Sequence, residues 1–279
     1  MAINNPSGNA MQTLLQLMSM LRDPQHGCPW DLKQSFASTA PHTLEEVYEV
    51  VDAIETNDIQ QLKEELGDLL FQVVFYAQLG KEQQVFDFET IAETITTKLL
   101  QRHPHVFPSA TLESFGQGSD ISSEQVVNNW EQIKTQEREQ KKAAQLVSVL
   151  DDVPAALPSM LRATKLQKRV SNVGFDWQSV QPVYAKVKEE LSELEVAMET
   201  GNNLHVEEEF GDLLFSMINL SRHLHLDSEA SLRKANRKFE ARFRSVERMV
   251  VETERAITDL SAAEMDMYWE RAKNIESKK

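Results

Sequence analysis

The chain has 279 residues, and its 44 acidic residues against 29 Lys and Arg give a formal net charge of −15. A surface this acidic repels a phosphate backbone, so general binding to DNA or RNA polymers is not expected. The 41% hydrophobic and 26% charged residues exclude a disordered or fibrous chain. The single cysteine, Cys28, excludes an internal disulfide framework, and the longest apolar stretch is too short to cross a bilayer. We therefore expect a cytoplasmic protein that is not bound to a membrane.

Apolar residues recur at helical spacing along most of the chain. Residues 1–22 carry an amphipathic pattern. A second pattern, with Pro41 near its start, has apolar residues every three or four positions at Leu44, Val47, Val51 and Ile54. Residues 59–79 are apolar on most sides, which is typical of a buried helix. Because no stretch alternates between apolar and polar residues as a strand does, we predict an all-α fold.

A segment of the first half of the chain returns in the second half. Glu65-Leu-Gly-Asp68-Leu-Leu-Phe71 reappears as Glu209-Phe-Gly-Asp212-Leu-Leu-Phe215, 144 positions later. At the same displacement, residues 45–49 return as residues 189–193. The repeat indicates duplication of a unit of roughly 120 residues, which is within the usual range for a domain. We expect two tandem helical bundles, one at 1–150 that includes a charged linker and one at 151–279.

Each copy carries two pairs of acidic residues at helical spacing. Glu190 and Glu193 lie three residues apart, so both side chains leave the same face of a helix, and Glu209 and Asp212 do so on the next helix. A short turn makes the two helices antiparallel neighbours, which lets four carboxylates converge. The first copy repeats this acidic quartet at Glu46, Glu49, Glu65 and Asp68. Like charges repel, and Asp68 and Asp212 sit inside apolar runs, so a bound cation is the simplest remedy.

The residue types also indicate which cation is bound. Bundles that hold two iron ions use histidine beside carboxylates, and no histidine belongs to either quartet, which disfavours an iron oxidase. Oxygen ligands alone suit Mg²⁺, with Mn²⁺ as a possible substitute, and Mg²⁺ is usually shared with substrate phosphates. A phosphate ester or anhydride is therefore the natural ligand.

His103 and His105 have no third or fourth ligand nearby, so we expect a structural role for them.

Other interpretations of these residues are open. Thr43 and Glu46 fit a helix capping box, in which Glu46 would only satisfy backbone donors. A sensor or scaffold that binds cation and ligand without turnover would carry the same quartets. Gly67 and Gly211 each disfavour a helix by roughly 1 kcal/mol, so we expect a close approach at both positions.

The order Glu-Glu-x-x-Glu, a short spacer and Glu-x-Gly-Asp resembles the MazG family of all-α nucleoside triphosphate pyrophosphohydrolases. Cys28-Pro-Trp-Asp31, Arg102-His-Pro-His105 and Val173-Gly-Phe-Asp176 extend the resemblance over nearly the whole chain. The resemblance implies a homodimer and Mg²⁺-dependent cleavage between the α- and β-phosphates of nucleoside or deoxynucleoside triphosphates. It also carries the role of metal ligand onto all eight acids of the two quartets. Glu189 is our candidate for the base that takes the proton of the attacking water.

Phosphates also need cationic partners. Lys234, Lys238 and Arg242 form an i, i+4, i+8 stripe, which we interpret as a triphosphate clamp, the alternative being a solvated face. The resemblance favours phosphate contact for Lys186, one turn before Glu190, the alternative being an ordinary i, i+4 ion pair with Glu190.

Two tryptophans are candidates for contact with the base. Trp177 and Trp269 could stack on a base or belong to the core, and the resemblance places Trp269 near the base. No set of hydrogen-bonding residues that would select one base can be identified in the sequence, so we expect broad base specificity. We also expect a role in clearing surplus or noncanonical nucleotides.

The first copy lacks several of these cationic groups. His42 stands where Lys186 stands, and Pro104 breaks the helix that would carry the basic stripe. Lys168 belongs to a basic set, with Lys165 and Arg169, that has no counterpart before Cys28. We therefore predict that the C-terminal copy is the main catalyst and count Lys168 among its substrate-binding residues.

Overall fold

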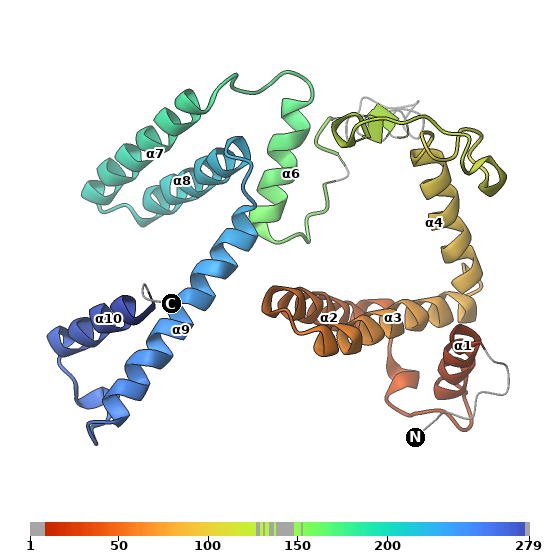
Figure 1. The fold of residues 1–279 in the computed structure, drawn as a ribbon, viewed down its shortest axis with the longest axis horizontal. Coiled ribbons are helices and arrows are strands. Elements are labelled where there is room, and N and C mark those ends of the chain that lie inside the picture. Colours follow the sequence, from red (N-terminus) through yellow and green to blue (C-terminus); the bar gives the residue numbers. More distant parts are fainter. Residues whose placement is uncertain are drawn as a thin grey trace. The chain divides into compact units, whose positions relative to one another are not determined.

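The computed structural model describes residues 9–126, 129–130, 132–133, 137, 148–151 and 153–276. All regular elements in these ranges are helices, so the predicted all-α fold is confirmed (Figure 1). The chain forms two compact units, residues 1–143 and residues 144–279. The expected boundary near residue 150 stays a prediction, since residues 138–147 lie outside the described ranges.

The first unit is built around a helical hairpin. Its helices are α1 (Ala10–Leu21), α2 (Phe36–Thr56), α3 (Ile59–Glu82) and α4 (Phe88–Arg102). Short 3₁₀ turns occupy Asp31–Lys33 and Leu112–Ser114. Helices α2 and α3 pack side by side, while α1 and α4 both pack against α3 (Figure 1). The core of the unit is formed by Met18, Val74, Phe75 and Leu79, from α1 and α3.

Local capping fixes the ends of the α2–α3 hairpin. Ser35 caps α2, since its hydroxyl accepts from the Ser38 backbone N–H and the Ser38 hydroxyl accepts from that of Ser35. Asn57 ends α2 in the left-handed conformation, at φ 58°, and Asp58 caps the start of α3. The two-residue connection makes the helices antiparallel.

The capping interpretation of Glu46 is wrong. The helix begins at Phe36, so Thr43 lies inside it and its hydroxyl contacts the Tyr76 hydroxyl at 2.7 Å. Pro41 lies in the second turn of the helix and not at its first position. The sequence pattern missed this extra turn because it is capped by serines upstream of the apolar run.

The second unit repeats the hairpin. Its helices are α6 (Ser159–Ser171), α7 (Val180–Thr200), α8 (Asn203–His223), α9 (Ser228–Val251) and α10 (Ala262–Glu276), with a 3₁₀ turn at Ile257–Asp259. Helices α7 and α8 pack side by side like α2 and α3, and α6 packs against α8. Gly201, at φ 68°, ends α7, and Asn202 caps α8. A separate core joins α9 to α10 through Val246, Val250, Leu260, Tyr268 and Ala272.

The copies differ after the hairpin. Helix α4 ends at Arg102, directly before His103 and Pro104, whereas α9 continues to Val251. The break expected from Pro104 is therefore confirmed, because proline has no N–H to continue the helix. The helix that follows the hairpin is therefore long enough for the basic stripe in the second copy, whereas α4 ends before an equivalent of Arg242 could appear.

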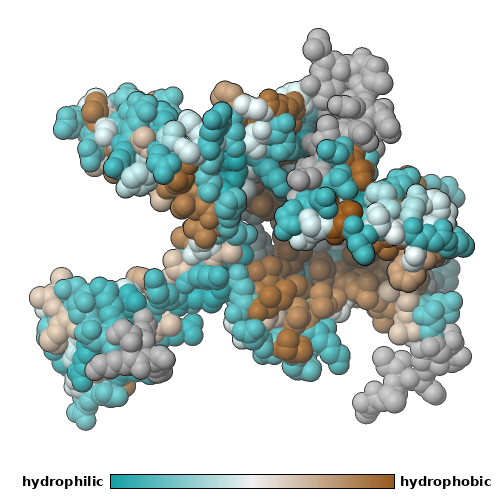
Figure 2. All heavy atoms as spheres, turned by 45° about the horizontal axis from the view of Figure 1, so that its top comes forward, coloured by the Kyte–Doolittle hydropathy of each residue, from teal (hydrophilic) through white to brown (hydrophobic). Residues whose placement is uncertain are grey.

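Helix α3 is not buried on all sides, contrary to the sequence prediction. Leu66 and Leu70 are 49% and 36% exposed on α3, and their counterparts Phe210 and Leu214 on α8 are 51% and 39% exposed. In Figure 2 hydrophobic side chains gather on the face formed by α2 and α3. Both hairpins thus present an uncovered apolar face within a single chain.

The expected close approach at Gly67 and Gly211 is also wrong for the single chain. A Cβ atom at either position would meet no atom within 4 Å.

Among the described residues, no helix is long and apolar enough to cross a membrane.

Candidate functional site

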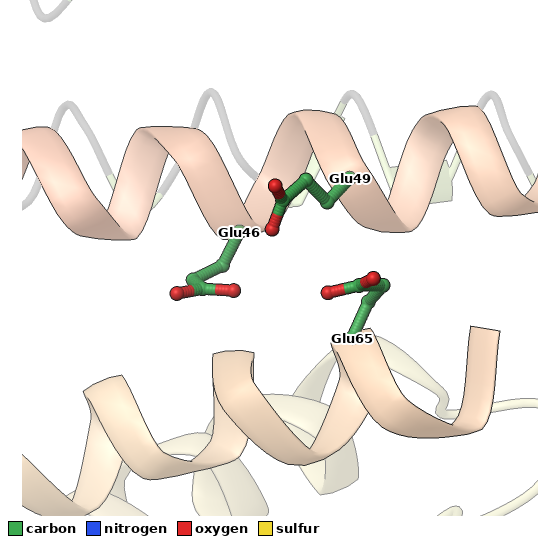
Figure 3. Close-up of side chains that lie close together, drawn as sticks. All are labelled: Glu46, Glu49 and Glu65. Carbon is green, nitrogen blue, oxygen red and sulfur yellow. The ribbon is translucent and has the colours of Figure 1, made fainter. Parts of the chain in front are cut away.

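Three carboxylates converge between the two helices of each hairpin. Glu46 and Glu49 project from α2 toward Glu65 on α3, as Figure 3 shows. Glu190, Glu193 and Glu209 do the same from α7 and α8. In each cluster, one oxygen atom per residue lies within 4.8 Å of the others. The spacing read from the sequence therefore brings three of the four acids of each quartet together.

The fourth acid of each quartet lies beside its cluster and not in it. Asp68 and Asp212 are exposed, although they sit in apolar segments, because those segments face outward. Asp68 still lines a cavity with Glu46, and Asp212 lines one with Glu190. Each aspartate is thus placed at the edge of its cluster, on the side of the cavity.

Crowding shifts the charge state of the clusters. Burial, followed by the negative charges of Asp68, Glu49 and Glu65, raises the pKa of Glu46 above its usual range. Loss of hydration also raises the pKa of Glu193, against the opposing charge of Lys186. Part of the rise in the pKa of Glu46 comes from neighbouring carboxylates, so like charges stand close together in its cluster. A divalent cation would remove this repulsion, and an all-oxygen donor set suits a hard cation such as Mg²⁺ or Mn²⁺.

Lys186 is a positively charged side chain that contacts the second cluster. Its Nζ lies 2.8 Å from Glu189 and 2.9 Å from the buried carboxylate of Glu190. These two contacts raise the pKa of Lys186. In the first copy His42 stands in its place and lies 3.8 Å from Glu45. Among the described residues, a lysine that contacts the converging carboxylates is therefore found in the C-terminal copy, at Lys186.

The sequence analysis missed a histidine beside the second quartet. His205 Nε2 lies 3.1 Å from Glu209 Oε1, one turn earlier on α8. Its counterpart Gln61 lies 3.3 Å from Glu65. The i, i+4 spacing of His205 and Glu209 is the sequence signal that could have predicted this contact. Each residue supports the first acid of its pair, and among the described residues His205 is not one of the converging ligands.

A cavity of about 410 Å³ adjoins the C-terminal cluster. Its lining includes the charged side chains of Lys186, Glu190 and Asp212. It also includes the buried amides of Gln167 and Asn219, the half-buried guanidinium of Arg222 and the aromatic side chains of Phe175, Trp177 and Phe215. The cavity therefore combines ionic groups with aromatic and amide groups, and its volume lies within the range of small-molecule sites.

The N-terminal cavity is smaller. It has a volume of about 250 Å³ and is lined by Trp30, Thr39, His42, Glu46, Asp68, Phe71, Gln72 and Phe75. Phe75 stands where the second copy has Asn219. Arg102, in the region of the expected basic stripe, is paired with Glu137 at 2.5 Å.

The loop that carries Phe175 and Trp177 is tied to α8. Arg222 donates to both carboxylate oxygens of Asp176, at 2.5 and 2.7 Å, and His223 lies 3.0 Å from the same group. Hydrogen bonds from Arg222 and His223, together with the charge of Arg222, lower the pKa of Asp176 to about 2. The aromatic wall of the cavity therefore depends on one ion pair, which the sequence analysis did not identify.

The remaining predicted site residues lie elsewhere in the second unit. Lys234, Lys238 and Arg242 are on α9, and neither they nor Trp269 line the cavity. Arg242 lies over the Trp269 ring, 4.9 Å from its centre, and Phe239 packs on the same ring at 5.2 Å. Trp269 is half-buried against the core of α9 and α10. Lys168 is exposed on α6 and does not line the cavity either.

His103 and His105 pack with Trp130 in the first unit. The rings of His103 and His105 are 5.6 Å apart, and His103 lies 5.2 Å from Trp130. His103 Nδ1 contacts the Leu99 carbonyl at 2.6 Å. Among the described residues neither histidine belongs to a group that could hold a metal, and both sit at the C-terminal end of α4.

Addition of Mg²⁺ should stabilise the protein against heat. Binding relieves the repulsion between the carboxylates, and a ligand at one hundred times its Kd stabilises the folded state by about 2.7 kcal/mol. The gain in Tm should be several degrees at pH 7.5 and smaller at pH 5, because protons compete for carboxylates whose pKa is raised. Scanning calorimetry with and without Mg²⁺ measures it. An equal gain in the double variant Glu46→Gln, Glu190→Gln would contradict the assignment.

Asp176→Asn should lower Tm at neutral pH. The pKa of Asp176 is depressed to about 2, so its pairing stabilises the fold fully above pH 4 and progressively less as pH falls toward 2. The difference in Tm between wild type and variant should therefore be largest above pH 5 and shrink between pH 4 and pH 2. A difference that does not change with pH would show that the ion pair is not its cause.

Comparison with known proteins agrees with this arrangement. The model of the MazG nucleotide pyrophosphohydrolase domain matches residues 34–107 and 178–246, one match per hairpin. The nucleoside triphosphate pyrophosphohydrolase of Escherichia coli K12 is 48% identical over 96% of this chain and 98% of its own length. The nucleoside triphosphate pyrophosphohydrolase/pyrophosphatase MazG of Thermotoga maritima is 40% identical over 96% of this chain and 97% of its own. The uncharacterized protein YabN of Bacillus subtilis is 36% identical over 95% of this chain but 52% of its own length. The two matched hairpins and the full-length similarity confirm the resemblance read from the acidic motifs: this chain belongs to the MazG family.

Proposed function

We infer that this protein is a hydrolase that converts nucleoside and deoxynucleoside triphosphates to monophosphates and pyrophosphate. The observation that carries the inference is the convergence of Glu190, Glu193 and Glu209 beside a cavity of suitable size for a nucleotide. Relatives of nearly the same length are named for this activity. We further propose that Mg²⁺ is the cofactor and that cleavage falls between the α- and β-phosphates.

The chain's own residues divide the work of the reaction. Glu190, Glu193 and Glu209 would hold the cation, and Asp212 at the cavity edge is positioned to complete the set. A bound Mg²⁺ supplies charge neutralisation for the phosphates and lowers the pKa of a coordinated water. The carboxylates would hold the cation, and the cation would orient the phosphates for in-line attack.

Glu189 and Lys186 are assigned the proton and phosphate roles. Glu189 is exposed and does not belong to the three converging carboxylates. Because it would not be a metal ligand, it can accept a proton from water. Lys186 bridges Glu189 and Glu190 and would transfer its contacts to a phosphate oxygen once the cation neutralises Glu190. A lysine held charged at this point favours a triphosphate over an uncharged ligand.

The C-terminal copy is proposed as the main catalyst. It has Lys186 where the first copy has His42, a larger cavity and the long helix α9 with Lys234, Lys238 and Arg242. We assign these α9 residues, with Lys168 and Trp269, to contacts with substrate outside the cavity that a single chain forms. Trp177 lines the cavity itself and is our candidate for stacking on the base.

We propose that two copies of the chain associate through the uncovered faces of the hairpins. Leu66 and Leu70 on α3, and Phe210 and Leu214 on α8, are spaced one turn apart and remain exposed in one chain. Gly67 and Gly211 lie next to these residues, with open space above them that a neighbouring helix can enter. Burial of such stripes between two hairpins would form four-helix bundles.

We place the enzyme in the cytoplasm, in agreement with its free cysteine, Cys28. Broad base specificity fits a role in clearing surplus or noncanonical nucleotides from the pool. The competing function is a sensor that binds nucleotide and Mg²⁺ without turnover. Release of pyrophosphate from a panel of triphosphates separates the two, since a sensor leaves its ligand intact.

Loss of charge in the C-terminal cluster should abolish turnover. Glu209→Gln and Asp212→Asn each remove one ligand charge, and we expect the turnover rate to fall at least about 100-fold with an unchanged far-UV spectrum. Pyrophosphate release from dNTPs with Mg²⁺ is the measurement. The matched N-terminal variants Glu65→Gln and Asp68→Asn occupy the corresponding positions and should leave most activity. Equal loss in both pairs, or loss in the N-terminal pair alone, would refute the assignment of the main catalyst.

A charged residue on the exposed hairpin face should disrupt association. Phe210→Glu places a carboxylate within the apolar stripe of α8, so the molar mass measured by light scattering should fall from that of two chains to that of one. Val85→Glu is the control, because Val85 is 64% exposed but lies outside the hairpin. A wild-type protein that is already monomeric would rule out the proposed association.

A further inference from the structure

We propose that Gln167 and Asn219 form a fixed hydrogen-bonding pair that recognises the polar edge of the nucleobase in the C-terminal cavity. The proposal rests on the function inferred above and adds a base subsite to it. The sequence analysis identified no residues that recognise the base, because these two residues lie on different helices, α6 and α8. Both line the cavity that Lys186 and Glu190 also line.

Gln167 presents an acceptor without a partner. Its side chain is buried, with 5% of the residue exposed, and its Nε2 donates to the Phe215 carbonyl at 2.9 Å. This bond fixes the orientation of the amide, so Oε1 is left as the remaining acceptor. Oε1 has no hydrogen-bond partner although it is buried. Buried acceptors of this kind are rare in folded proteins, and a ligand that donates a proton here would satisfy it.

Asn219 presents the complementary donor. Its Oδ1 accepts from Nε and Nη2 of Arg222, at 3.0 and 2.8 Å. Arg222 is itself held by Asp176, so the Asn219 amide cannot rotate without loss of these bonds. Its Nδ2 is therefore the group available to a ligand. The residue is 7% exposed, which keeps competing water away from it.

Aromatic side chains stand around this pair. Phe175, Trp177 and Phe215 line the same cavity, and they are 78%, 43% and 44% exposed, which is unusual for large apolar groups beside a buried polar pair. Aromatic faces stack on any base, while the amide pair reads its edge. The combination of stacking surface, fixed acceptor and fixed donor matches a heterocyclic base and not a simple phosphate or a lipid.

The N-terminal copy supplies an internal comparison. Phe75 replaces Asn219 there, so no donor stands at this point. At a displacement of 145 positions Arg22 aligns with Gln167, and its Nε and Nη2 donate to Glu82, at 2.8 and 2.6 Å. The first cavity is lined instead by Gln72 of α3, whose buried Oε1 also has no hydrogen-bond partner. Among the described residues, the first copy thus keeps an unpartnered amide acceptor but has neither the Asn219 donor nor the Lys186 charge at the corresponding positions.

The fixed order of the pair sets which bases fit. An acceptor beside a donor matches a base edge with an N–H next to a ring nitrogen or carbonyl acceptor, and all four natural bases have such an edge. The pair consequently admits every natural base but discriminates against a ligand that has no polar edge. Broad specificity then arises because the pair binds a feature that all four bases share, and not because the base makes no polar contact.

The test compares base-bearing and base-free ligands. Wild type, Gln167→Leu and Asn219→Asp are titrated calorimetrically, in the presence of Mg²⁺, with non-hydrolysable α,β-methylene analogues of dATP and dCTP. The same analogue of a deoxyribose triphosphate without a base is the reference ligand. We expect each variant to bind the base-bearing analogues at least tenfold more weakly, with less than a twofold change for the base-free ligand. Asn219→Asp retains the acceptor for Arg222, and Thr164→Val, on α6, is the folding control.

The outcomes separate the subsite from the function. Equal weakening for all three ligands, or no weakening for any, would overturn the base subsite, as would a wild-type protein that binds the base-free ligand as tightly as the others. If wild type still releases pyrophosphate from dNTPs in those cases, the proposed function stands. If wild type neither binds the analogues nor hydrolyses dNTPs, the proposed function fails and the subsite with it.

Discussion

Repulsion between carboxylates held on facing helices is the constraint on which the rest of this structure depends. Glu190 is buried on α7, yet it stands within a cluster of like charges that also contains Glu193 and Glu209. A fold tolerates such a cluster only if the helices that carry it are fixed by other contacts and if a cation compensates the charge. The capped, two-residue connection of each hairpin provides the first, and Lys186 provides part of the second.

The surroundings of the clusters follow from this constraint. Because the acids occupy the space between the two helices of a hairpin, the apolar residues of α3 and α8 turn to the other side. Leu66, Leu70, Phe210 and Leu214 are therefore exposed in one chain, and their burial requires a second surface. The acidic clusters and the apolar face are thus two consequences of one sequence pattern, in which acids at i and i+3 alternate with large apolar residues at i+1 and i+5.

Helical periodicity made much of this predictable. The clusters depend on spacing within two helices and on a short turn, so Glu46, Glu49 and Glu65 could be placed together from the sequence alone. The ion pair of Asp176 with Arg222 and the pair of Gln167 with Asn219 could not, because they join segments whose approach depends on packing of α6 and a loop onto α8. Exposure was also hard to predict: an apolar helix was taken as buried, whereas one of its faces is open in a single chain.

The two copies diverge at the positions around the acids and not at the acids themselves. All eight carboxylates are retained, but His42 for Lys186 and Phe75 for Asn219 change the charge and hydrogen-bonding capacity of the N-terminal cavity. Retained carboxylates still permit cation binding, and such binding stabilises the hairpin that carries them. The first copy lacks Lys186 and Asn219, the groups proposed above to contact a phosphate and a base. A copy with the cluster but without its partners is therefore expected to contribute to folding and association, while chemistry is concentrated in the copy that has both.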